Sequence, residues 1–435
     1  MNKLYDKILI LLVFLQFSDL YKVLIYPFNV TTQLFSIITI FITFFYIISN
    51  KISLKRLLNH KILRLWLWLV LYLPITINLV HFIIGNLSLN DFVYWFSFLT
   101  MMGFLFLSTT IYFYKNSYPK YINQFFQLVL LSIVISLFIG WYDYEILRSL
   151  VKVSADLEEY MYQDNSRAIG FYTQSNMLAR SILFTFIIFA GTILYRKSSF
   201  INYNFIVLFT LMLLLTGSRT SMILFLIFLI FYIPRFSYKK IFSNSFNKKL
   251  KVITTVLTIP IAILFTLLLL NAMPFFSKLI TDNNVYKRFS FITDTSSNSS
   301  LEKDRSVNAR IIVFNQYISK IIDQPLIGYG SNKRSEYIKN NTFLNGSQNQ
   351  YLENAFSFGI FYVTFFFYVF FYTIKKLKFD ERITFDRYLY FKIFLLLIII
   401  YGFSVNYLLI NRLFLITTGF FLGIYMKSQL SKPIV

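Results

Sequence analysis

The sequence predicts an all-α polytopic membrane protein with about twelve transmembrane helices and one large extracytoplasmic loop between helices 9 and 10. Hydrophobic residues make up 57% of the 435 residues and aromatic residues 20%, whereas charged residues make up only 14%. A water-soluble protein of this length could not cover such a composition with polar surface. Apolar runs of about 18 residues or more recur along the chain, and each is long enough to cross about 30 Å of hydrocarbon as an α-helix.

Read in order, the apolar runs predict the individual spans. They lie at 6–25, 32–50, 63–84, 91–114, 121–141, 175–195, 201–217, 220–236, 252–273, 351–374, 387–404 and 406–426. We take the first run as a retained helix because no small-residue cleavage site follows it.

Basic residues predict the orientation. Lys and Arg gather in alternate short connections, as at 51–64, 235–251 and 375–387, and the other short connections are much poorer in them. The positive-inside rule then places both termini in the cytoplasm. Much of the formal net charge of +23 is explained in this way, so the sequence predicts no nucleic-acid partner.

The whole chain, 1–435, is predicted to form a single integral membrane domain with two long outward segments. The smaller is 142–174 and the larger is 274–350, and loops of the second length are usually functional. Within the larger segment, Ile311, Phe314 and Ile318 recur at helical spacing before a Gln-Pro pair. This pattern predicts an amphipathic helix that lies on the membrane face or packs over the spans, with a purely structural lid as the alternative.

The sequence predicts neither a metal nor a cofactor. It contains no cysteine, which excludes thiolate metal sites and disulfides. Its two histidines, His60 and His81, have no acidic helical partner nearby, so a zinc site is not expected.

Arginines beside the outer ends of spans are the first candidates for function, because a charge near hydrocarbon is costly. Arg219 lies in "TGSRTSM" directly after Ser218, between two apolar runs, and must therefore sit at the membrane boundary. Snorkelling of Arg219 to a lipid phosphate is the alternative. Arg310 opens the predicted amphipathic helix of the large loop.

Three further polar residues lie at predicted outer ends. Arg167 stands before "AIGFYTQSN", in which Asn176 lines a cavity or caps the sixth span. Arg412, in "LLINRLFL", lies one to two turns into the last span and should face a partner or a polar cavity. Converging guanidinium groups suit a lipid-linked phosphate or diphosphate, because they bind phosphate oxygens in pairs and stabilise charge on a leaving diphosphate.

With these motifs the chain resembles the O-antigen ligase/polymerase superfamily of bacterial polysaccharide assembly, which includes the Wzy-type polymerases. The similarity covers the layout of the spans and the motifs "RAIGFYTQSN", "GSRTS" and "NAR…DQPLIGYG…SQNQYLENAFSFG". It implies metal-independent transfer of a glycan from an undecaprenyl diphosphate carrier to a sugar hydroxyl on the outer face of the inner (plasma) membrane. It also implies that Arg219 and Arg310 handle the diphosphate.

The family commonly has His-Asn where this chain has Gln348 and Asn349, and that His is thought to activate the acceptor hydroxyl. A glutamine amide cannot accept a proton at neutral pH, so Gln348 can orient the hydroxyl but cannot act as a base. The base is then Glu353, Glu336 or His81. Alternatively, positioning supplies most of the rate, or the chain is not an active enzyme.

The resemblance leaves more than one function open. Two features favour a capsule, exopolysaccharide or O-antigen polymerase. One is the missing His, and the other is a composition rich in Phe, Ile, Asn and Lys, which is typical of an AT-rich genome. A ligase that transfers finished glycan is the alternative, followed by a polysaccharide flippase or transporter and a non-catalytic scaffold. A transporter would carry its charged residues within the spans. The expected partners are a lipid-linked glycan and membrane lipid, and a flippase and a chain-length regulator are open candidates.

Overall fold

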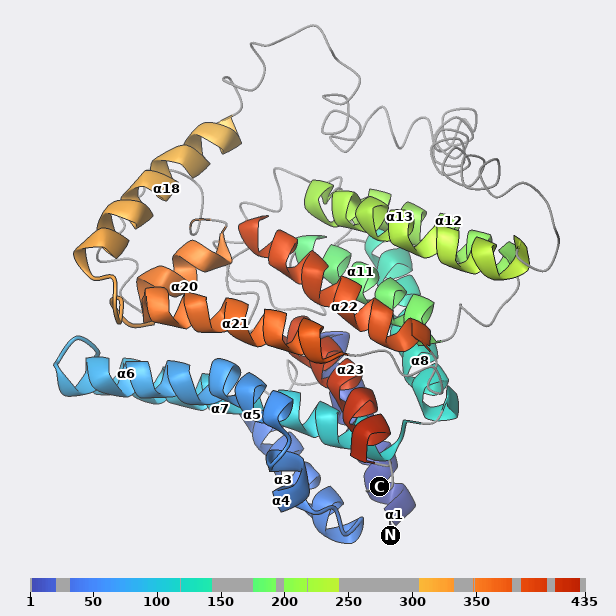
Figure 1. The fold of residues 1–435 in the computed structure, drawn as a ribbon, viewed down its shortest axis with the longest axis horizontal. Coiled ribbons are helices and arrows are strands. Elements are labelled where there is room, and N and C mark those ends of the chain that lie inside the picture. Colours follow the sequence, from blue (N-terminus) through green and yellow to red (C-terminus); the bar gives the residue numbers. More distant parts are fainter. Residues whose placement is uncertain are drawn as a thin grey trace, which may run out of the picture. The chain divides into compact units, whose positions relative to one another are not determined.

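The computed structural model describes residues 2–20, 32–117, 119–142, 175–192, 199–216, 218–241, 305–331, 347, 349–377, 385–404 and 411–430. The regular structure of these residues is helical, and none of them forms a strand. Figure 1 labels the helices in chain order. The chain divides into two compact units. The first comprises Met1–Phe17, Phe28–Ile122 and Ser297–Val435, and the second comprises Ser18–Pro27 and Asn123–Ser296.

The first unit holds most of the described helices. They are α1 (Asn2–Phe17), α3 (Thr32–Ser49), α4 (Leu54–Leu58), α5 (Lys61–Leu67), η2 (Trp68–Tyr72), α6 (Leu73–Ile83), α7 (Leu89–Lys115), α18 (Arg305–Asp323), α20 (Gln350–Phe358), α21 (Ile360–Lys376), α22 (Phe385–Tyr401), η5 (Gly402–Ser404) and α23 (Arg412–Leu430). The π turn η2 comes just before Pro74, whose ring nitrogen cannot donate the usual helical hydrogen bond.

The core of the first unit centres on Trp66 of α5. Its ring lies 4.9 Å from that of Phe370 of α21 and 6.0 Å from that of Phe414 of α23, measured between ring centroids. The indole Nε1 donates a hydrogen bond of 3.1 Å to the Thr373 hydroxyl, so the buried ring leaves no polar atom unpaired. These contacts tie α5, α21 and α23 together, and α23 in turn packs along α7.

The second unit contains most of α8 (Pro119–Tyr142), together with α11 (Ser175–Thr192), α12 (Ser199–Thr216) and α13 (Arg219–Ile241). Phe186 of α11 lies at its centre, in ring contact with Phe209 of α12 and with Phe225 of α13. The Tyr232 hydroxyl of α13 donates to Asn202 of α12 at 2.9 Å.

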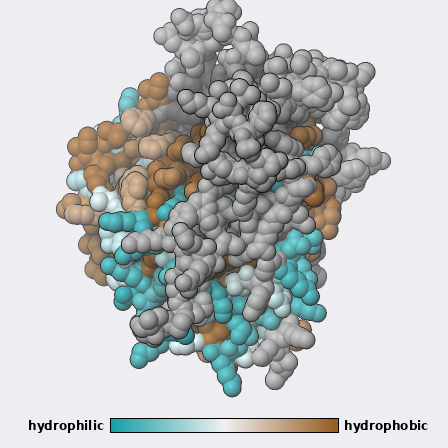
Figure 2. Space-filling model, turned by 45° about the vertical axis from the view of Figure 1, so that its right-hand side comes forward, coloured by the Kyte–Doolittle hydropathy of each residue, from teal (hydrophilic) through white to brown (hydrophobic). Residues whose placement is uncertain are grey.

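Several described helices have the length and composition of membrane spans. Lys61–Ile83, Leu89–Lys115 and Lys120–Leu137 are long and apolar enough to cross a membrane. Shorter apolar helices lie at Ile37–Ser49, Asn176–Gly191, Asn204–Thr216, Thr220–Ile230 and Leu389–Tyr401. Many large hydrophobic side chains of these helices are exposed, and Figure 2 shows them as brown areas of the surface. These are the features of a polytopic integral membrane protein.

Two predicted spans have other bounds in the structure. The run at 6–25 was expected to be one helix, but α1 ends at Phe17 because Asp19 has a φ of 58°, which an α-helix does not allow. The last span was expected to begin at 406, but α23 begins at Arg412. The side chain of Asn411 accepts a hydrogen bond of 2.9 Å from the backbone N–H of Leu413 and so caps the helix there. The predicted span 252–273 lies outside the described residues.

The predicted span 351–374 is two helices, because Gly359 separates α20 from α21. Gly359 has φ 82° and ψ 170°, a conformation open essentially only to glycine. The backbone N–H of Ile360 donates to the Pro325 carbonyl at 2.7 Å instead of continuing the helix. The chain therefore turns between α20 and α21, and α20 is free to pack against α18.

Candidate active site

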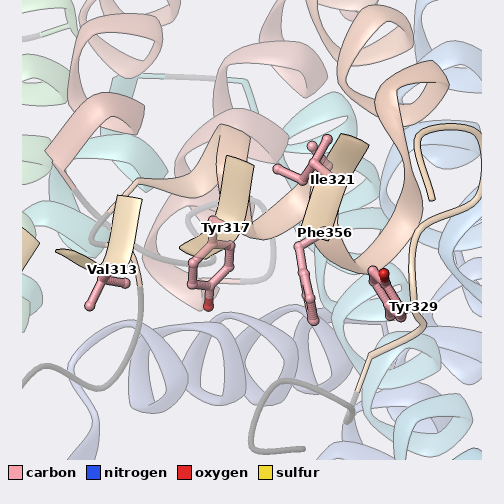
Figure 3. Packing of buried hydrophobic residues seen from close by; sticks show 6 residues of the cluster. Val313, Tyr317, Ile321, Tyr329 and Phe356 are labelled. Atoms are coloured by element: carbon pink, nitrogen blue, oxygen red, sulfur yellow. The ribbon is translucent and has the colours of Figure 1, made fainter. Parts of the chain in front are cut away.

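The site is built where α18, α20 and the turn at 325–331 meet in the first unit. A cluster of buried side chains joins them: Val313, Tyr317, Ile321, Tyr329, Ala355 and Phe356 (Figure 3). The Phe356 ring lies 5.3 Å from the Tyr317 ring and is stacked on the Tyr329 ring at 5.0 Å. Because Val313, Tyr317 and Ile321 follow one another at intervals of four residues, they form one face of α18.

Backbone hydrogen bonds hold the turn against the end of α20. The N–H of Tyr329 donates to the Phe356 carbonyl at 2.8 Å, and the N–H of Gly330 donates to the Ser357 carbonyl at 3.0 Å. These bonds satisfy carbonyls near the C-terminal end of α20 that have no partner within the helix. The turn is thereby fixed relative to α20.

His81 and Asn78 of α6 support the same turn. The Ile327 carbonyl can only accept, so His81 carries its proton on Nε2 and donates it to that oxygen at 3.1 Å. His81 Nδ1 lies 3.3 Å from the Asn86 amide nitrogen and accepts from it. Asn78 exchanges two hydrogen bonds with Ser331, at 2.9 and 3.1 Å. His81 is fully buried with both nitrogens engaged, so it is a structural residue and is not available as the base for which it was a candidate.

Glu353 is the buried carboxyl group of this site. Its Oε1 accepts hydrogen bonds from the Tyr317 hydroxyl at 2.8 Å, from the Ser347 N–H at 2.8 Å and from the Ser347 hydroxyl at 3.2 Å. Its Oε2 is buried and finds no hydrogen-bond partner among the described residues. One oxygen therefore fixes the carboxyl group, and the other is left for a further proton donor.

Asn349 is the N-cap of α20. Its side-chain oxygen accepts from the backbone N–H groups of Tyr351 and Leu352, at 2.9 and 3.3 Å. The Ser347 hydroxyl lies 2.9 Å from the Asn349 carbonyl oxygen and 3.2 Å from Glu353 Oε1, and it shares its single proton between these two acceptors. This ties the segment before the helix to Glu353. The alternative of a helix cap, which the sequence had left open for Asn349, is thus realised.

Sequence reasoning missed a polar stripe on α20. Gln350, Glu353, Asn354 and Ser357 are all buried, and their spacing of three, four and seven residues places them on one face of the helix. Only Glu353 had been singled out. The signal was present in "QYLENAFSF", where polar residues recur with helical period inside an otherwise apolar run.

The other predicted site residues are divided between the two units. Arg310 is in α18 of the first unit, but it does not open the helix as predicted, because α18 begins at Arg305. Arg412 is the first residue of α23, so its predicted position one to two turns inside the last span was wrong. The physical reason is the Asn411 cap.

Ser218, Arg219 and Asn176 belong to the second unit. Ser218 is buried and donates to the Ser221 hydroxyl at 3.2 Å, and Arg219 opens α13. Asn176 is an exposed residue in the first turn of α11. Arg167, Gln348 and Glu336 lie outside the described residues. The structure thus brings Asn349 and Glu353 together, whereas the convergence of the arginines stays a prediction.

Comparison with known proteins gives one family. The model of the O-antigen ligase family matches residues 205–368, a range that contains α13, α18 and α20 and parts of α12 and α21. Arg219, Arg310, Gln348, Asn349 and Glu353 all fall within it. No curated protein matches the chain. The match supports the O-antigen ligase/polymerase superfamily on a range that includes the site.

Proposed function

We propose, from the similarity to the O-antigen ligase family, that this protein is a Wzy-type polymerase. It joins undecaprenyl-diphosphate-linked oligosaccharide repeat units into capsule, exopolysaccharide or O-antigen on the outer face of the plasma membrane. The family similarity supports an enzyme that acts on a lipid-linked glycan. Gln348 in place of the family's usual His favours the polymerase over the ligase.

The observation that carries the proposal is the Glu353 carboxyl group, with one oxygen held by three donors and the other unpartnered among the described residues. In the proposed step, the bond between the anomeric carbon and the donor diphosphate oxygen breaks, and its electron pair stays with the diphosphate. The acceptor hydroxyl oxygen bonds to the anomeric carbon, and its proton passes to Glu353 Oε2. A carboxylate can thus serve as the base that Gln348 cannot be.

The arginines supply the complementary charge in this proposal. Arg219 and Arg310 bind the diphosphate, and their guanidinium groups offset the charge that grows on it as the glycosyl bond breaks. Arg219 opens α13, where the positive end of the helix dipole adds to its attraction for an anion. Arg167, Arg412, Ser218, Asn176 and Asn349 are proposed as further substrate-binding residues.

The proposal includes the membrane topology predicted by the sequence: twelve spans, cytoplasmic termini and an outward segment 274–350. The chain contains no cysteine, so single cysteines introduced into it can be labelled without background. A cysteine in place of Ser299 should react with a membrane-impermeant maleimide from outside. A cysteine in place of Lys55 should react only after permeabilisation. Labelling of both from the same side would refute this topology.

Complementation of a strain depleted of the gene tests the activity. Variants Arg219→Ala, Arg310→Ala, Gln348→Ala and Glu353→Gln should leave single repeat units on the lipid carrier at normal membrane levels of the protein. Asp323→Asn is the matched control for Glu353→Gln, since this exposed carboxyl group at the end of α18 pairs only with Lys320 among the described residues. Long chains that fail to be attached would indicate a ligase, and normal polymer in all variants would refute the site.

A further inference from the structure

Two apolar faces lie side by side on α18. The first packs on α20 and consists of Val313, Tyr317 and Ile321. The second, the apolar stripe, consists of Ile311, Phe314, Ile318 and Ile322, which are 54%, 45%, 36% and 70% exposed. Each residue of the first face is followed directly by one of the stripe, and successive residues of an α-helix lie about 100° apart. The apolar stripe therefore borders the buried face.

The remaining side of α18 is polar. It carries Gln316, Ser319, Lys320 and Asp323, and between residues 311 and 323 only Ile312 is an exposed apolar residue outside the stripe. Lys320 and Asp323 form an ion pair there, at 3.3 Å. The two apolar faces together take up roughly half of the helix circumference. A helix that packs on one neighbour and otherwise faces water needs an apolar arc of only about 100°, so the contact with α20 explains the first face and not the second.

The apolar stripe leads to the end of a helix that can cross a membrane. After Ile322 the chain enters the turn, where Leu326 is 60% exposed. The carbonyl of the next residue, Ile327, accepts a hydrogen bond from His81 of α6, and Figure 1 shows the turn beside the end of that helix. α6 completes the apolar stretch 61–83, which is long enough to span a membrane, and its last residue, Ile83, is 72% exposed. Exposed apolar side chains thus extend from a membrane-spanning helix over the turn and onto α18.

We propose that α18 is an interfacial helix whose apolar stripe lies among the acyl chains of the lipid bilayer. Its polar side then faces headgroups and water, where Lys320 suits anionic lipid, and its buried face holds α20. The partner is assigned as lipid because the bilayer around α6 already reaches the turn that carries Leu326. In the topology proposed above, this is the outer leaflet. The inference goes beyond the proposed function, since it holds whichever reaction the protein catalyses.

Insertion of α18 also sets the level of the candidate active site. The Tyr317 hydroxyl, on the face next to the apolar stripe, donates to Glu353 at 2.8 Å. With the stripe in lipid, this carboxyl group lies at the level of the headgroups. Opening of α18 as a lid would withdraw the stripe from the acyl chains or uncover the buried face, and both expose apolar surface to water. α18 is therefore a fixed wall of the site and not the lid that the sequence had left open.

The test measures which solvent surrounds each side of α18. The chain contains no cysteine, so the full-length protein in nanodiscs of phosphatidylcholine and phosphatidylglycerol can carry one nitroxide label at a time. Ile318→Cys and Ile322→Cys place the label in the apolar stripe, and the neighbouring Ser319→Cys and Asp323→Cys place it on the polar side as matched controls. The ratio of collisions with O2, which concentrates in hydrocarbon, to collisions with a water-soluble nickel chelate should be several-fold higher at the two stripe positions.

Quenching by lipid provides a second readout. An environment-sensitive fluorophore on Ile322→Cys should lose more of its emission than one on Asp323→Cys when the nanodiscs contain phospholipid brominated on its acyl chains. Ile322 is 70% exposed, so its replacement removes little internal packing. It carries the test if Ile318→Cys fails to accumulate in membranes.

The outcomes are distinguishable. A high ratio of O2 to nickel collisions in the stripe, together with quenching from the acyl chains, supports the inference, whether or not the same protein transfers glycan. Nickel collisions as frequent in the stripe as at Ser319→Cys and Asp323→Cys show that the stripe faces water, and they overturn it. Rare collisions with both reagents show that protein covers the stripe, which also overturns it. Broadening between labels on two molecules in one nanodisc would then identify a second copy of the chain as the cover.

Discussion

Replacing Gly359 by alanine tests whether the turn between α20 and α21 builds the site. An added Cβ would lie 1.9 Å from the Leu326 carbonyl oxygen and 2.7 Å from the Ile327 nitrogen, so backbone would have to move. The backbone conformation of Gly359 alone costs a non-glycine residue about 1–3 kcal/mol. Moving the 325–330 turn would also weaken three backbone hydrogen bonds, from Tyr329, Gly330 and Ile360, at about 1 kcal/mol each.

Gly85→Ala is the matched control for this prediction. Gly85 also has a positive φ, of 78°, but an added Cβ there would meet nothing within 4 Å. Its substitution should therefore cost only the strain of the left-handed region, about 1–2 kcal/mol. We expect Gly359→Ala to destabilise the protein by about 3 kcal/mol more than Gly85→Ala, from the three weakened hydrogen bonds.

The assay is thermal unfolding of both purified variants in the same detergent. Unfolding is monitored as the fraction of protein that remains monodisperse after heating. Gly359→Ala should have a Tm several degrees below that of Gly85→Ala and should also lose transfer activity, because α20 carries Glu353. Equal Tm values for the two variants would refute the reasoning. They would mean that the 325–330 turn moves to accommodate the new methyl group without losing its hydrogen bonds.

Three further predictions follow from contacts in the first unit. Tyr317→Phe removes one hydrogen-bond donor to Glu353 and should lower the free energy of unfolding, measured by denaturation, by about 1–2 kcal/mol. It should also lower the rate of glycan transfer. An unchanged rate would contradict the role of Glu353. Asn78→Ala leaves the buried Ser331 without both its hydrogen bonds and should cost about 1–3 kcal/mol, whereas a Tm equal to that of the wild type would show that the turn does not depend on α6. Burial lowers the pKa of His60 below its ordinary value of 6.5. The unfolded chain then binds the proton at higher pH than the folded chain, so stability is fully present above pH 6.5 and falls as the pH drops below it. The Tm of the wild type should decrease from pH 7.5 to pH 5.5 more than that of His60→Gln, and equal decreases would exclude the histidine as the cause.

The sequence by itself determined that the protein is helical and suited to a membrane. Its long apolar runs fit the hydrocarbon core, where no water is available, so the backbone N–H and C=O groups of a span must bond to one another within a helix. The resemblance of "SQNQYLENAFSFG" to the family motif also singled out Asn349, and the lack of a His in that motif made Glu353 a candidate base. The helix break at residue 359 was not predicted. Glycine is tolerated within helices, and only the close approach of the Leu326 carbonyl makes the positive φ at Gly359 necessary.

Only the tertiary structure decided which polar atoms are used. His81 had been a candidate base, but hydrogen bonds with Ile327 and Asn86 engage both its ring nitrogens. Ile327 lies 246 positions away from His81 in the chain, so this contact could not be read from the local sequence. Tyr317 meets Glu353 across 36 residues because α18 packs against α20. Whether a buried polar atom is satisfied depends on neighbours that the fold brings from distant parts of the chain, and no local pattern records them.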